Sequence, residues 1–161
     1  MIIPNYQPAE LDTTIVMTRR KLMRIIDRSR VKDAIQKAER RTSGQICVSV
    51  SSLFWGGVEG AANKAFARLG LARTTQRNAV LLFVVPSRRK IVVIGDVGIH
   101  EKVGQQFWSS MVAKVAARFK EGDFTGGLVG AVEEIGTELA TYFPYDPALD
   151  LNELSDDVEI K

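Results

Sequence analysis

Two apolar segments joined by a short connection constrain the fold more than any other feature of the chain. Residues 79–85 and 91–94 are near-continuous runs of apolar residues, many of them β-branched, which is typical of strands covered on both faces of a sheet. Residues 86–89 begin with a proline and leave room only for a hairpin turn. The sequence therefore predicts an antiparallel pair of buried strands.

The register of this hairpin predicts a polar site at one of its ends. With so short a turn, Ile91 lies opposite Val84, and Asp96 comes beside Ala79. Polar residues that precede the first strand then meet polar residues that follow the second. The residues expected to converge are Arg77, Asn78, Asp96, His100 and Glu101.

A further strand and a helix precede the hairpin. Residues 45–51 alternate between apolar and polar side chains, which predicts a strand. A helix predicted over residues 61–69 then ends at Gly70. A strand, a crossover helix and a second strand form a right-handed unit with parallel strands. The predicted fold class is α/β, with a small mixed sheet that combines this parallel β-α-β unit with the antiparallel hairpin strand.

Four more helical segments are expected. Residues 18–28 carry apolar residues on one helical face with Arg and Lys around them, and predict a short basic helix. A second helix, residues 31–38, has Ser29 as its expected N-cap. The other two are expected near residues 104–120 and 124–142, the last with Asp123 or Thr125 as N-cap.

The charge is unevenly distributed along an otherwise ordinary globular sequence. Residues 1–44 contain ten basic and five acidic side chains, whereas residues 144–161 contain one basic and six acidic. No basic segment followed by an apolar stretch opens the chain, and no apolar run is long enough to span a membrane. We expect a cytoplasmic protein in which the single cysteine, Cys47, is a small buried hydrophobic residue.

Four motifs, in the same order along the chain, resemble the TPM domain family. Its helix-to-strand opening is similar to residues 38–46, and its second strand resembles Arg-Asn-Ala-Val-Leu-Leu at residues 77–82. Its glycine turn resembles residues 94–99, and the entry to its last helix resembles residues 119–128. The resemblance identifies residues 30–143 as a TPM-like domain, with an N-terminal arm and short basic helix over 1–29 and an acidic extension over 144–161.

The resemblance implies a three-layer α/β/α sandwich and several activities. Members of the family are associated with divalent cations, particularly calcium, with acid phosphatase activity in a plastid relative, and with quality control or assembly of membrane protein complexes. Many are exported or anchored in a membrane. The chain resembles a short, soluble branch of the family, because it shows neither a signal peptide nor a membrane anchor.

The glycine turn departs from the family pattern in a way that affects a metal site. Where many relatives have an acidic residue this chain has His100, and an aspartate usual in the following helix is replaced by Gln105. Calcium prefers six to eight oxygen ligands, so both changes weaken the expectation of a calcium site. The remaining candidate ligands of a divalent cation, calcium or magnesium, are Asp96, Glu101, Asn78 and Asp123.

Three interpretations of function stay open at this point. The first is a non-catalytic binding or adaptor domain with a cation at the Asn78, Asp96 and Glu101 end of the hairpin. The second is a metal-assisted phosphatase, with Arg77 stabilising the phosphoryl charge and Asp96 and His100 as further catalytic candidates. Each of these residues also has a structural alternative, such as Asp96 fixing the turn.

The third interpretation is a binder of anionic surfaces that uses residues 19–41. No aromatic residue interleaves with these basic residues, so nucleic acid is not the expected partner. A protein or a membrane protein complex is expected instead, and the patch around Phe54 and Trp55 is the first place to look, although burial of both rings in the core is favoured over exposure. The glycines match no nucleotide-binding spacing, so no nucleotide cofactor is expected.

Overall fold

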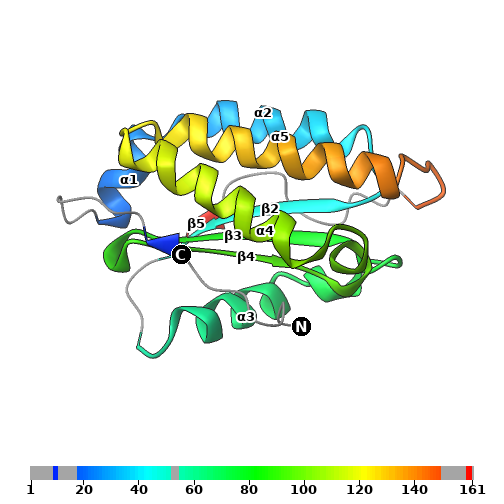
Figure 1. Cartoon of the computed structure of the whole chain (residues 1–161), viewed down its shortest axis with the longest axis horizontal. Coiled ribbons are helices and arrows are strands. Elements are labelled where there is room, and N and C mark those ends of the chain that lie inside the picture. The colour runs from blue at the N-terminus through cyan, green and yellow to red at the C-terminus, as the bar shows by residue number, and fades with distance from the viewer. Residues whose placement is uncertain (1–8, 11–17, 52–54, 150–158, 161) are drawn as a thin grey trace.

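A mixed sheet forms the middle layer of the computed structural model, which describes residues 9–10, 18–51, 55–149 and 159–160 (Figure 1). Five strands lie in the order β1-β4-β3-β2-β5. The three longer strands occupy the centre and the two short strands form the edges. Their bounds are β1 Ala9–Glu10, β2 Gln45–Val50, β3 Ala79–Val85, β4 Lys90–Gly95 and β5 Glu159–Ile160.

The central pairings confirm the predicted topology and register. Strand β2 runs parallel to β3, and β3 runs antiparallel to β4 with Val84 opposite Ile91. The edge strands were not predicted: β1 pairs antiparallel with β4, and β5 pairs parallel with β2. Segments close to both ends of the chain therefore complete the sheet.

Helices cover both faces of the sheet and make the predicted α/β/α sandwich (Figure 1). Helices α1, α2, α4 and α5 lie on one face, and α3 lies on the other. Two short 3-10 helices, η1 and η2, precede β3 and β4 respectively. The bounds are α1 Arg19–Ile25, α2 Arg28–Glu39, α3 Val58–Arg68, η1 Leu71–Arg73, η2 Pro86–Arg88, α4 Val97–Lys120 and α5 Phe124–Tyr142.

The core lies between the sheet and its two helical layers. Every residue of β3 is buried, as the continuous apolar run predicts for a central strand. Glycine lets the helices approach closely: a Cβ added at Gly136 of α5 would lie 2.6 Å from the Cβ of Ala38 of α2. Gly136 therefore serves the close packing of α5 against α2.

The helix boundaries differ from the predicted ones at two places. Asp27, not Ser29, is the N-cap of α2, because its Oδ1 accepts a hydrogen bond from the backbone N of Arg30 at 3.1 Å. Helix α4 is interrupted at Gly104, whose φ of 76° and ψ of 171° are not helical, so its longer part begins where the sequence predicted, and the short helical segment from Val97 up to this kink is the unpredicted part. Asp123 is confirmed as the N-cap of α5.

A separate correction concerns the burial of Trp55. This side chain is fully exposed, at 100% of its possible surface, whereas the sequence favoured burial. It lies directly before Gly56 and Gly57, outside any helix or strand, so no element carries it toward the core. Phe54, its predicted neighbour in the patch, is outside the described residues.

Candidate functional site

A paired arginine and aspartate occupy the predicted end of the hairpin. The Nε of Arg77 donates a hydrogen bond to Oδ2 of Asp96 at 2.6 Å, and its Nη2 donates to Oδ1 at 2.8 Å. The side chain of Asp96 is completely buried, while that of Arg77 is 40% exposed. The guanidinium therefore covers the carboxylate and separates it from solvent.

Two backbone features bring these residues together. Arg77 adopts a left-handed conformation with φ of 52°, and its carbonyl oxygen accepts a hydrogen bond from the backbone N of Gly98 at 2.8 Å. A Cβ at Gly98 would lie 2.1 Å from the carbonyl oxygen of Gln76. Only glycine therefore allows the first turn of α4 to lie against the segment that leads into β3.

Asp96 also fixes the start of α4. Its Oδ1 accepts a hydrogen bond from the backbone N of Val97 at 2.8 Å, and its own backbone N donates to the carbonyl oxygen of Ala79 at 2.9 Å. A carboxylate at this position also stabilises the positive end of the helix dipole. The hydrogen bond to Asp96, and then its negative charge, raise the pKa of Arg77 above its ordinary value.

His100 belongs to the same neighbourhood but bonds to a buried tryptophan. Its backbone N donates to the carbonyl oxygen of Asp96 at 2.9 Å. Its Nδ1 accepts a hydrogen bond from Nε1 of Trp108 at 3.1 Å. Trp108 is fully buried, and a Cβ at Gly95 would lie 2.3 Å from its ring. The imidazole thus satisfies the polar atom of a core side chain whose ring covers the end of β4.

The other predicted residues point elsewhere. Asn78 is buried, and its Nδ2 donates to Oγ of Ser43 at 3.2 Å, while its Oδ1 has no hydrogen-bond partner. Glu101 is exposed on α4. Asp123 lies at the far end of α4, where it caps α5 (Figure 1).

Asp123 makes its own ion pair at that far end. Nη1 of Arg118 donates to Oδ2 of Asp123 at 2.8 Å, and the backbone N of Gly126 donates to Oδ1 at 2.9 Å. These two bonds, the one from Arg118 first, lower the pKa of Asp123. The structure therefore unites Arg77, Asp96 and His100 and separates Asp123 from them.

This arrangement does not fit the four-residue cation site expected from the sequence. Within residues 18–51 and 55–149, no three or more His, Cys, Asp or Glu side chains lie close enough together to hold a metal ion. Both oxygens of Asp96 already accept hydrogen bonds from Arg77. Asn78 Oδ1 is the one predicted ligand atom that is both buried and without a hydrogen bond.

The residues that sequence reasoning missed at this end are Trp108 and Gly98. Trp108 lies in the helix predicted near residues 104–120, and nothing in the sequence indicated that its indole N–H would bond to His100. Gly98 had a usable signal, because a glycine two residues after an N-cap aspartate weakens a helix unless the backbone needs the space.

The comparisons with known proteins agree with this architecture. A family model described as the TPM domain matches residues 16–138. The chain belongs to the TPM domain family. The match begins before α1 and ends within α5.

A solved structure supports the same assignment. The NMR structure of the BA42 protein from the psychrophilic bacterium Bizionia argentinensis is 31% identical in sequence to this TPM domain, with a TM-score of 0.76. The alignment covers 85% of this chain and 96% of BA42. A search among curated proteins found no match. In the part of the chain that the structure describes, no helix combines the length and the apolar character needed to cross a membrane.

Proposed function

We propose that this TPM domain is a non-catalytic binding or adaptor domain, and that the polar residues at the Asp96 end of the hairpin hold the fold together. The observation that carries this proposal is the two-bond contact between Arg77 and Asp96, in which the carboxylate is completely buried. A buried carboxylate that is covered by a guanidinium supports the adjoining turn and helix start, as the third bond to Val97 shows.

The alternative, a metal-assisted phosphatase, needs these residues in other roles. Asp96 would have to exchange Arg77 for the cation, because both of its oxygens already accept hydrogen bonds from Arg77. The Nδ1 of His100 is already used by Trp108, which leaves only Nε2 for a substrate. The geometry therefore favours the binding domain over the hydrolase.

The expected partner is a protein or a membrane protein complex, and the expected compartment is the cytoplasm. The fully exposed Trp55 supports a binding role, because tryptophan is enriched at interfaces and is costly to expose when it has no partner. The proposal assigns contact with a partner to this part of the surface and assigns a structural role to the Asp96 end.

A phosphate ester assay tests the proposal directly. The full chain and two variants, Asp96→Asn and Asp33→Asn, would be incubated with p-nitrophenyl phosphate and either magnesium or calcium. Asp33 is exposed on α2 and serves as the matched control. We expect no turnover above buffer in any sample. Turnover in the full chain that survives in Asp33→Asn and is lost in Asp96→Asn would contradict the proposal.

A metal titration followed by NMR tests the same proposal without relying on activity. Calcium, magnesium and zinc would be added separately to the labelled full chain. We expect the backbone signals of Asp96, Val97 and Glu101 to stay unchanged at cation concentrations that occur in cells. Saturable shifts confined to Asn78, Asp96 and Glu101 would instead establish the cation site predicted from the sequence.

A further inference from the structure

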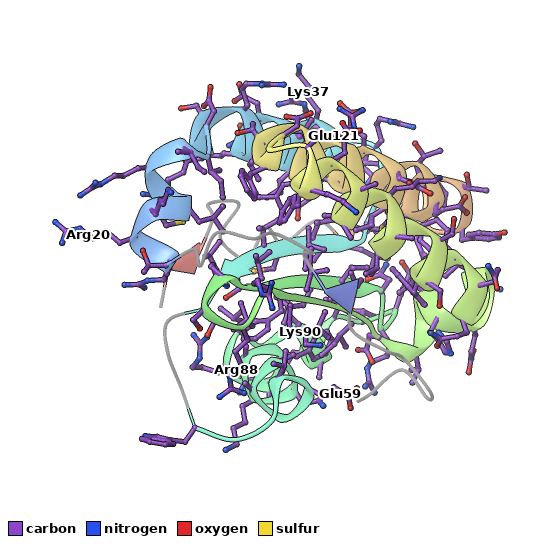
Figure 2. All side chains as sticks on the ribbon, turned by 60° about the vertical axis from the view of Figure 1, so that its left-hand side comes forward. Arg20, Lys37, Glu59, Arg88, Lys90 and Glu121 are labelled. Atoms are coloured by element: carbon purple, nitrogen blue, oxygen red, sulfur yellow. The ribbon has the colours of Figure 1, made fainter. Side chains whose placement is uncertain are left out.

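Three segments far apart in the sequence form one surface at the end of the sheet opposite Asp96. They are α1, the turn over residues 86–90 and residues 55–57, and together we call them the basic end. Helix α1 contacts η2, and Nη1 of Arg88 donates a hydrogen bond to the carbonyl oxygen of Gly56. Figure 2 turns this end toward the viewer, with Arg20 on α1 and Arg88 and Lys90 on the turn.

The basic end is rich in cations and its three segments contain no acidic residue. Helix α1 contributes four basic side chains and the turn contributes three, which are Arg19, Arg20, Lys21, Arg24, Arg88, Arg89 and Lys90. Among the described residues, the side chains of Arg20, Lys21 and Arg24 have no hydrogen-bond or ion-pair partner.

Glu10 of β1 pairs with Lys90 in the sheet, whereas two other acidic residues, Asp27 and Asp123, already have partners outside the three segments. Asp27, which follows α1, accepts a hydrogen bond from the backbone N of Arg30. Asp123 forms its ion pair with Arg118. Asp27 and Asp123 each bond to a residue outside the three segments, so these two carboxylates do not neutralise the cations of the basic end.

Apolar side chains lie exposed among these cations. Trp55 is fully exposed, and Ile25, the last residue of α1, is 47% exposed. Met23 lies with Arg19, Arg20 and Arg24 around an open hollow of about 530 Å³. The basic end thus combines a positive surface with an aromatic and an aliphatic side chain that the core does not cover.

We propose that the basic end docks onto an anionic lipid bilayer. Its cations face the lipid phosphates and carboxylates, and Trp55 and Ile25 enter the headgroup layer. Clustered Lys and Arg are attracted to anionic leaflets, and tryptophan prefers the interface between membrane and water. This proposal rests on the binding role proposed above, because it names a lipid bilayer as the partner. It involves none of the residues at the Asp96 end.

A bilayer suits this surface better than nucleic acid does. Ile25 and Met23 are aliphatic, and such side chains gain free energy by leaving water for the acyl boundary but cannot stack on bases. The one described aromatic residue of the surface, Trp55, comes from a separate segment rather than from among the arginines of α1. Duplex DNA nevertheless serves as the competing ligand in the test.

The test measures co-sedimentation of the full chain with two kinds of vesicle, phosphatidylcholine alone and phosphatidylcholine with phosphatidylserine. We expect binding to the second kind only, with binding that weakens as salt is added. Tryptophan fluorescence locates the contact, because the chain contains two tryptophans and Trp108 is fully buried. The emission of Trp55 should shift to shorter wavelength with anionic vesicles, and Trp55→Phe should abolish that shift.

Two double variants of equal charge change separate the basic end from basic residues elsewhere. Arg20→Gln with Arg24→Gln removes two charges from α1 and should weaken vesicle binding about tenfold or more. Lys37→Gln with Arg40→Gln removes two exposed charges at the other end of α2, within the 19–41 segment first considered, and should change binding less than about threefold. All four positions are on the surface, so we expect both double variants to remain folded. The fluorescence of the buried Trp108 checks this.

Three outcomes would overturn the inference. One is equal binding to neutral and anionic vesicles, and another is an equal loss of binding in the two double variants. The third is salt-dependent binding to duplex DNA without binding to anionic vesicles. None of these results concerns Asp96 or His100, so the binding role and the lipid partner can fail independently.

Discussion

The two ends of the sheet use charged residues in opposite ways. At the Asp96 end, the carboxylate is buried and every charged or polar contact described there is made within the protein. At the basic end, Arg20, Lys21 and Arg24 face solvent beside the exposed Trp55. Buried and mutually bonded groups are costly to disturb, whereas exposed charges contribute little to stability. Sequence changes should therefore affect folding at the first end and binding at the second.

The largest loss of stability is expected from Gly98→Ala. The added Cβ would lie 2.1 Å from the carbonyl oxygen of Gln76 and 2.7 Å from that of Arg77, and backbone atoms cannot move aside as a flexible side chain can. We expect the free energy of unfolding to fall by about 2 kcal/mol or more, as measured by urea denaturation. Gly130→Ala is the control, because a Cβ there meets nothing within 4 Å and should stabilise α5 by up to about 1 kcal/mol.

A smaller but clear loss is expected from Asp96→Ala. The variant removes the N-cap of α4, which alone should reduce the free energy of unfolding by about 1 kcal/mol, and it also removes the partner of Arg77. Asp33→Ala, an exposed position on α2, should stay within about 0.5 kcal/mol of the native chain. Equal stabilities of the two variants in thermal denaturation would show that the Asp96 end is not structural.

His100→Ala should also cost about 1 kcal/mol, because it leaves the indole N–H of the buried Trp108 without its acceptor. Trp108 itself supplies the readout, since its fluorescence changes when the surroundings of the ring change. His100→Asn keeps an acceptor near the same place and should restore part of the stability. If His100→Asn and His100→Ala are equally unstable, the hydrogen bond to Trp108 contributes nothing and only the packing of the ring matters.

An acid-sensitive pair lies near the basic end, and its effect should be smaller still. Arg118 and the backbone N of Gly126 lower the pKa of Asp123 in the folded protein. The stabilisation is therefore complete above the unfolded pKa, about 3.9, and is lost as the pH falls through the lower folded value. Asp123→Asn should be less stable than the native chain at neutral pH, and the two stabilities should converge below about pH 4. A constant difference at all pH values, measured by denaturation at low salt, would contradict this.

The features that could be predicted from sequence are those set by local periodicity and chain length. The two continuous apolar runs predicted buried strands, and the short connection over residues 86–89 allowed only a hairpin between them. The pairing of Val84 with Ile91 could therefore be predicted. That register alone placed Arg77 and Asp96 at the same end.

The features that could not be predicted depend on which partner a side chain chooses in three dimensions. The sequence placed Arg77, Asn78 and Asp96 together, but it did not show that Arg77 would cover Asp96 or that Asn78 would face Ser43. Asp123 belongs to a motif near Phe124 and was combined with Asp96 because both are acidic, although the length of α4 separates them. The predicted burial of Trp55 was wrong, because an apolar residue type does not by itself determine burial.

Trp55→Ala should have the smallest effect on stability of all these changes and therefore sharpens the contrast between the two ends. A fully exposed side chain loses no buried contact when it is shortened, so the free energy of unfolding should stay within about 0.5 kcal/mol of the native value. Vesicle binding by the same variant should fall several-fold, since the ring no longer enters the headgroup layer. A large loss of stability would mean that Trp55 packs against the protein and belongs to the fold. The two ends would then no longer differ in this respect, because both would depend on internal contacts.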